Sequence, residues 1–245
     1  MDNDYRAKYF TSRQMSRLAA TLKNGSPSAA FYGYVEEIFL ETLLDRVNDV
    51  EVNTQPLKWG SLMEVVLFNE LGLNYKMTHK MTKTHPIHSK FWSGTPDLIA
   101  KGEKIGEIKC FYPKNFAKLS NCINKQEYGL FKDEFPKEFW QCVSNAIIME
   151  EKKAEIITFM PYKEKLIEVI NLIEESNFLE SNGLEPDDYY FIRQNSIESF
   201  PYLPETSKLN SINTFEFEVK QEDIDFLTER VLMAHEEVLK LITNT

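Results

Sequence analysis

The sequence lacks the features of membrane proteins and of disulfide-stabilised proteins. No apolar run in its 245 residues approaches the length of a bilayer span, and the N-terminus is too polar for a signal peptide. Its three cysteines, Cys110, Cys122 and Cys142, show neither paired metal-ligand spacing nor a disulfide framework. Internal repeats and low-complexity tracts are absent as well. We therefore expect a cytoplasmic protein without a membrane partner.

Composition and charge narrow the class further. Hydrophobic residues make up 42% and charged residues 27% of the chain, which are globular values, and the length suffices for one sizeable core. A net charge of −10 argues against a protein that coats nucleic acid non-specifically over its whole surface. A local basic patch remains compatible with this charge.

One segment carries such a basic patch. No acidic residue occurs between Glu70 and Asp97, whereas several lysines and histidines do. The histidines follow no regular ligand spacing, so a zinc site is disfavoured and a solvated loop or strand that contacts phosphates is favoured. The basic residues of the segment are Lys76, Lys80, Lys83 and Lys90, together with His79, His85 and His88.

Hydrophobic periodicity predicts a mixture of helices and strands, in which the periodic apolar residues cover a core. Helices are predicted over about residues 12–24, 28–43, 59–72, 136–149, 163–175 and 222–242, and residues 115–131 are expected to be partly helical. Strands are predicted over 154–159, 189–192 and 215–219. Two prolines make residues 195–211 an irregular segment.

Residues 93–110 predict a β-hairpin with strands 98–100 and 105–110 and a turn near Gly102. With the turn there, Asp97 faces Glu107, while Glu107 and Lys109 share one face of their strand and Ile108 points to the other. Two facing carboxylates repel each other unless positive charge lies between them. A divalent metal beside Lys109 resolves this repulsion; the alternative is an exposed hairpin with a solvated salt bridge.

Glu64 is the acidic residue of interest in the predicted helix 59–72. Leu67 and Phe68 lie three and four positions further on, so the carboxylate sits among apolar neighbours on the helix surface. An unpaired carboxylate is costly in such a place. Two explanations stay open: a bond to a basic residue at the edge of the core, or a position facing a metal site.

Pro96-Asp97 followed by Glu107-x-Lys109 resembles the signature of the PD-(D/E)xK nuclease superfamily. Over most of its length the chain resembles the lambda-exonuclease-like (YqaJ-type viral recombinase) branch of that superfamily. The segments that carry the resemblance, in chain order, are Phe10-Thr11-Ser12, Tyr34-Val35-Glu36-Glu37, Trp59-Gly60 through Glu64, Gly94-Thr95-Pro96-Asp97, Gly106-Glu107-Ile108-Lys109-Cys110 and Trp140-Gln141.

The resemblance implies an α/β fold with a restriction-endonuclease-like core, in which helices flank a mixed central β-sheet. It implies one nuclease domain over residues 1–245. Within this domain, residues 1–58 form N-terminal helices, 59–160 the catalytic core, and 161–245 C-terminal helices and strands.

The resemblance also assigns roles to residues. Asp97 and Glu107 would bind Mg²⁺ or Mn²⁺ together with the main-chain carbonyl of Ile108, and Glu64 would help to hold a second ion or its water. The implied catalytic residues are Glu64, Asp97, Glu107, Lys109 and Gln141. Lys109 would orient the attacking water, and Gln141 would position either the attacked phosphate or the Lys109 side chain. Some relatives carry a four-cysteine iron–sulfur cluster, which this chain lacks the ligands to form.

DNA binding is assigned to residues outside this set. The lysine-rich segment would follow the phosphate backbone without recognising bases. An arginine commonly precedes the Thr/Ser motif of the branch and binds the 5′ phosphate, and Arg6, Arg13 and Arg17 remain alternatives for it. Val143 replaces the second glutamine that often follows Gln141. The predicted DNA-binding residues are Ser12, Arg13, Arg17, Lys76, Lys80, Lys83 and Lys90.

The implied function is a metal-dependent exonuclease that resects linear double-stranded DNA from the 5′ end and exposes a 3′ single strand. A single-strand annealing protein would be its partner, relatives form homo-oligomeric rings around DNA, and a phage-encoded protein would act in the bacterial host cytoplasm. A structure-specific or restriction-like endonuclease is the first alternative. A catalytically idle DNA-binding module is the second.

Overall fold

A computed structural model describes residues 8–47, 54–78, 83–100, 104–175 and 177–245. Its centre is a five-stranded mixed sheet in the order β2-β5-β6-β7-β8, in which only β6 and β7 run parallel. This architecture confirms the predicted α/β class with a mixed central sheet. The strands are β2 (Tyr75–Met77), β5 (Leu98–Ala100), β6 (Lys104–Lys109), β7 (Lys153–Phe159) and β8 (Ile212–Glu218).

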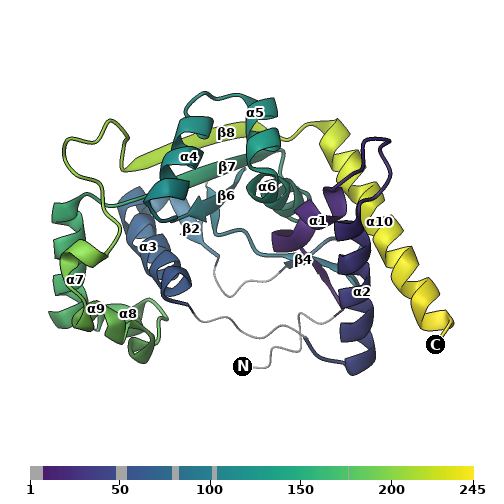
Figure 1. The fold of residues 1–245 in the computed structure, drawn as a ribbon, viewed down its shortest axis with the longest axis horizontal. Helices are drawn as coiled ribbons and strands as arrows, with labels where there is room; N and C mark the ends of the chain where they lie inside the picture. Colours follow the sequence, from purple (N-terminus) through teal and green to yellow (C-terminus); the bar gives the residue numbers. More distant parts are fainter. Residues whose placement is uncertain (1–7, 48–53, 79–82, 101–103, 176) are drawn as a thin grey trace.

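Helices cover both faces of this sheet because its strands alternate two sets of apolar side chains. Ile105 and Ile156 point to a core shared with α1, α2, α4, α5, α6 and α10, whereas Ile108 and Ile157 point to a core shared with α3, α7, α8 and α9. Figure 1 shows α3 and α7–α9 on one side of the strands and α1, α2 and α10 on the other.

The helices on the first side of the sheet are α1 (Met15–Ala19), α2 (Ala29–Leu44), α4 (Pro113–Ile123), α5 (Tyr128–Glu134), α6 (Pro136–Met149) and α10 (Gln221–Thr243). Those on the second are α3 (Gln55–Leu71), α7 (Lys163–Glu175), α8 (Phe178–Ser181) and α9 (Tyr190–Gln194). No helix within the described ranges is long and apolar enough to cross a bilayer.

A second, three-stranded sheet joins the N-terminus to the segment that precedes the hairpin. β1 (Phe10–Thr11) pairs in parallel with β4 (Trp92–Gly94), which pairs antiparallel with β3 (Lys83–Thr84). β1 and β4 are far apart in the sequence, with Phe10 paired to Trp92, so local periodicity does not predict this parallel pairing.

Most predicted elements are confirmed. α6 has the predicted bounds, and the predicted hairpin strands are β5 and β6, although the turn at Gly102 lies outside the described residues. The prediction of a strand at Tyr189–Ile192 is wrong. These residues lie in a 3-10 helix (Pro186–Tyr189) and in α9, because helical geometry buries Tyr189 and Ile192, three positions apart, in the α3–α7 core.

The first predicted helix also differs in detail. Residues Ser12–Gln14 form a 3-10 turn, η2, before α1, which ends at Ala19. The Ser12 hydroxyl group forms a 2.8 Å hydrogen bond with Ser144 Oγ in α6. The contact ties the N-terminal turn to the helix that faces β6.

Candidate active site

The hairpin brings two predicted site residues together. The β5–β6 register pairs Leu98 with Gly106, so its continuation by one residue places Asp97 opposite Glu107, as the sequence predicts. The Ile108 backbone N–H donates a 2.7 Å hydrogen bond to Asp97 Oδ2. This bond fixes the Asp97 carboxylate immediately before β5, although the strand pairing itself begins only at Leu98.

Glu107 is the most deeply buried member of the site, with no exposed surface. Its Oε2 accepts a 2.7 Å hydrogen bond from Gln141 Nε2 and lies 3.4 Å from Lys109 Nζ. Its Oε1 accepts a hydrogen bond from Asn145 Nδ2. Gln141 and Asn145 are four residues apart in α6 and therefore share one face of the helix, which they turn toward β6.

Lys109 lies beside these carboxylates at the end of β6. Its backbone carbonyl accepts a 2.8 Å hydrogen bond from Thr158 Oγ1 of β7, which fixes the strand end in the sheet. Only 17% of its side chain is exposed. Within the described residues no hydrogen bond joins Gln141 to Lys109; Gln141 binds Glu107 instead of the lysine considered for it from the sequence.

Glu64 of α3 faces the same cluster. Its side chain is partly exposed, and its electrostatic neighbours are Asp97, Lys109 and Arg13. It forms no direct ion pair with any residue in the described part of the chain. The structure therefore favours a position facing the Asp97–Lys109 cluster over a salt bridge at the edge of the core.

The cluster holds more acidic groups than basic ones. Burial, and then the Asp97 carboxylate, raise the pKa of Glu107 well above its ordinary range. The same two causes raise the pKa of Glu64 to about 8. Burial alone would lower the pKa of Lys109, but the Glu107, Asp97 and Glu64 carboxylates outweigh it and raise this pKa. Lys109 is therefore an ammonium ion. Because one such charge does not balance three ionised carboxylates, protonated Glu64 and Glu107 are favoured when no cation is bound.

The residues fit a hard divalent cation. Mg²⁺ is commonly held by one or two carboxylates while it keeps several waters, and Asp97 and Glu107 provide two. No group of three His, Cys, Asp or Glu side chains within the described ranges is already arranged around one point. Such a group is not required for a cation that retains water. A bound cation would favour the ionised forms of Glu64 and Glu107, which burial and the Asp97 carboxylate disfavour.

The predicted DNA-binding residues of the N-terminal turn fall into three different environments. Arg13 is exposed beside Glu64. Arg17 forms a 2.6 Å ion pair with Glu37 and stacks over the Tyr34 ring, so its guanidinium is engaged in joining α1 to α2. Ser12 is only 3% exposed, so its hydroxyl contacts the protein interior. Arg6 lies outside the described residues.

The lysine-rich segment is exposed where it is described. Lys76 on β2, Lys83 on β3 and Lys90 are exposed, and Lys80 lies outside the described residues, as does His79. His85 is buried and stacks between Trp92 and His88 at ring-centroid distances of 4.9 and 4.7 Å. Its Nδ1 accepts hydrogen bonds from the backbone N–H groups of Ile87 and His88, so it serves the turn as a structural acceptor.

Asn145 and Ser144 are not among the site residues predicted from the sequence. Asn145 is completely buried and binds Glu107; Ser144 is completely buried and accepts a 2.9 Å hydrogen bond from Trp92 Nε1. The available signal was helical spacing: Asn145 lies one turn beyond Gln141, whereas Val143 at the position of the missing glutamine packs in the core.

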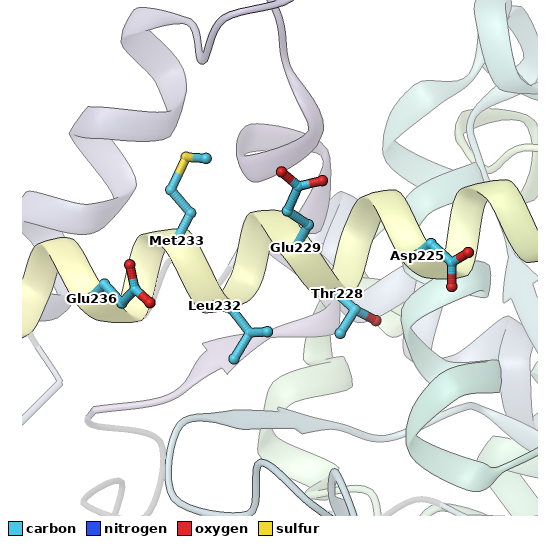
Figure 2. A pocket seen from close by; sticks show the side chains of 6 residues that line it. All are labelled: Asp225, Thr228, Glu229, Leu232, Met233 and Glu236. Atoms are coloured by element: carbon cyan, nitrogen blue, oxygen red, sulfur yellow. The ribbon is translucent and has the colours of Figure 1, made fainter.

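A depression on α10 lies apart from this cluster. Its six lining side chains all come from α10, and Figure 2 shows Glu229 and Met233 on one side of the helix and Thr228 and Leu232 on the other. Three of the six are acidic, which is unfavourable for DNA, and none is a predicted site residue.

Comparison with solved structures identifies proteins that share the fold of this chain. No protein-family model and no curated protein sequence matches the chain. Among solved structures, the alkaline exonuclease LHK-Exo from Laribacter hongkongensis, also solved in complex with dAMP, matches with a TM-score of 0.63 at 12% identity, over 99% of this chain and 93% of its own. A phage-related exonuclease from Haemophilus somnus 129PT matches with a TM-score of 0.59 at 14% identity, over 99% of this chain and 98% of its own. The chain thus has the fold of these exonuclease structures across almost its entire length.

Proposed function

We propose that the protein is a divalent-metal-dependent DNA exonuclease that hydrolyses phosphodiester bonds of linear double-stranded DNA. The observation that carries the proposal is the meeting of Asp97, Glu107, Lys109 and Glu64 in one largely buried cluster with too little positive charge. The exonuclease fold of the solved neighbours supports it.

Asp97 and Glu107 would hold Mg²⁺ or Mn²⁺ with the main-chain carbonyl of Ile108, and Glu64 would contribute from α3. A divalent cation at this position supplies positive charge to the scissile phosphate and lowers the pKa of water, which phosphodiester hydrolysis at neutral pH requires. Asp97 is oriented for this task by the Ile108 N–H, and Glu107 by the amides of α6.

Lys109 acts as a fixed hydrogen-bond donor. The surrounding carboxylates raise its pKa, so Nζ holds its proton and orients an attacking water or a phosphoryl oxygen by donation. A proton acceptor for the water must come from the carboxylates or from solvent. Gln141 steadies Glu107 rather than Lys109, and the exposed lysines Lys76, Lys83 and Lys90 follow the DNA backbone through phosphate contacts.

Resection from the 5′ end, which leaves a 3′ single strand for an annealing protein, and assembly into a ring complete the proposal. Arg13 is the better placed of the two described arginines to bind a 5′ phosphate, because it is exposed beside Glu64 whereas Arg17 is paired with Glu37.

The test is digestion of 5′-phosphorylated linear duplexes with one end blocked, in Mg²⁺ and in chelator, alongside covalently closed circular DNA. We expect one strand to shorten from the open end in Mg²⁺ only, and the circle to remain intact. Lys109→Ala should fold normally and lower the rate by about 10²- to 10³-fold. Nicking of the circle would favour the endonuclease alternative, and an inactive protein that still binds DNA would favour the idle module.

A further inference from the structure

Glu107 is held by two amides from successive turns of α6, of which only Gln141 was expected at the site. Asn145 supplies the second. Among the described residues it alone donates to Oε1, whereas Oε2 has both Gln141 and Lys109. Losing Asn145 would therefore leave one oxygen of a fully buried carboxylate without a donor.

Burying the Asn145 side chain is energetically unfavourable. Its side chain has no exposed surface, and its Oδ1 has no hydrogen-bond partner in the described part of the chain. A buried acceptor without a partner lowers the stability of the folded protein. An apolar side chain of similar size would avoid this cost. The contribution of Asn145 therefore lies in the hydrogen bond that its Nδ2 donates to Glu107 Oε1.

The backbone of β4 determines where Asn145 sits. A Cβ atom at Gly94 would lie closer than 3.0 Å to Asn145 Oδ1, to Ser12 Oγ and to Ile148 Cδ1. Gly94 thus lets α6 and the N-terminal turn approach β4 closely enough for the short Asn145 side chain to reach Glu107.

We propose that Asn145 is a positioning residue that holds the Glu107 carboxylate in the orientation that binds the divalent cation. The inference rests on the proposed function and deepens it, because it assigns to Asn145 a part of the metal affinity. Without the Asn145 donor, Oε1 is free to rotate toward other donors, and the two carboxylates no longer present a fixed pair to the ion. Partners that orient metal ligands typically contribute about 10- to 100-fold to metal affinity.

Ser144 provides a matched control. It is the neighbouring residue on α6, is equally buried, and also makes side-chain hydrogen bonds, but to Ser12 and Trp92 rather than to Glu107. Ser144→Ala therefore removes a buried polar group from the same helix without touching the carboxylate. It separates an effect on the metal from a general loosening of α6.

The experiment is a calorimetric Mn²⁺ titration of the full-length protein, of Asn145→Ala and of Ser144→Ala, with thermal melting to verify folding. We expect Asn145→Ala to weaken Mn²⁺ binding by about tenfold or more and Ser144→Ala to stay within about twofold of the parent protein. If alanine at position 145 prevents folding, Asn145→Leu fills the volume without a donor and should show the same loss.

The outcomes separate the inference from the proposed function. Equal Mn²⁺ affinity in the parent and in Asn145→Ala would overturn the inference while leaving the nuclease proposal intact. Equal losses in Asn145→Ala and Ser144→Ala would also overturn it, because the effect would then be one of helix packing. A parent protein that binds no Mn²⁺ would overturn the proposed function itself.

Discussion

The backbone N–H of Ile108 donates a 2.7 Å hydrogen bond to the Asp97 carboxylate across the β5–β6 hairpin. The β5–β6 pairing ends at Leu98 and Gly106, and beyond it the Asp97 carboxylate accepts the hydrogen bond that a backbone carbonyl accepts within the ladder. This bond holds the carboxylate next to Glu107 and Lys109. The hairpin presents a second acid to a carboxylate that is already buried. The Asp97 carboxylate also acts on Glu64 and contributes to its raised pKa.

Glu64→Gln should stabilise the metal-free protein at alkaline pH. The pKa of Glu64 is raised to about 8 in the folded protein, against about 4.3 in an unfolded chain, so the unfolded state loses its proton first. Stability should fall as pH rises from about 4 to 8, and the glutamine removes this loss. We expect a gain in Tm of several °C at pH 9, since one unit of pKa difference corresponds to about 1.4 kcal/mol, and little gain at pH 4.

Thermal melting in chelator at the two pH values tests this expectation. Added Mg²⁺ should raise the Tm of the parent protein at pH 9 more than that of Glu64→Gln, since a bound ion replaces the missing positive charge. An equal effect of the substitution at both pH values would contradict the raised pKa.

His85→Asn should reduce the sensitivity of the fold to acid. Burial, and then the neighbouring His88, lower the pKa of His85, and its Nδ1 must stay unprotonated to accept two backbone N–H groups. The unfolded chain takes up the proton at a pH of about 6.5, so stability should fall as pH drops below that value. Asparagine retains an acceptor for the turn but does not titrate.

The measurement is the Tm between pH 5 and pH 8. We expect the parent protein to lose a few °C more than His85→Asn over this interval. His235 also has a lowered pKa and is present in both proteins, so its contribution cancels in the comparison. Parallel curves for the two proteins would show that His85 does not contribute.

Gly94→Ala should destabilise the protein strongly. The new methyl group would overlap Ser12 Oγ and Asn145 Oδ1, and neither η2 nor α6 can withdraw without losing the packing around β4. We expect a loss of about 1–3 kcal/mol or more in urea unfolding. Gly60→Ala is the matched control, because its methyl group in α3 meets nothing within 4 Å and should add about 0.5–1 kcal/mol through helix propensity.

Arg13→Ala and Arg17→Ala should have opposite signatures. Arg13 is exposed next to Glu64, so its loss should weaken binding to 5′-phosphorylated duplex and reduce the salt dependence of that binding by about one phosphate contact, with little effect on Tm. Arg17 is paired with Glu37 and packed on Tyr34, so its loss should lower Tm and leave the salt dependence unchanged. Fluorescence anisotropy at several salt concentrations distinguishes the two; the reverse pattern would reassign the phosphate contact to Arg17.

Local sequence determines which residues share a face of a strand or a helix, because these faces repeat every two or every three to four residues. The two-residue period of a strand and one short turn are enough to place Asp97, Glu107 and Lys109 on one face of a hairpin, and the structure has that register. Pro136 and the apolar stripe that follows give α6 the bounds predicted for it. In both cases the residues that determine the geometry lie close together in the sequence, within one hairpin or one helix.

Tertiary structure alone decided which side chains meet across the chain. Gln141 and Asn145 reach Glu107 from 34 and 38 residues away, and Ser12 meets Ser144 across 132 residues, because the sheet, α6 and the N-terminal turn pack together. The same packing pairs Arg17 with Glu37 and leaves Arg13 exposed. It also makes Tyr189–Ile192 helical, although the composition of this segment is typical of a strand. Periodicity reports the face that a residue occupies, but burial and long-range contacts determine what that face touches.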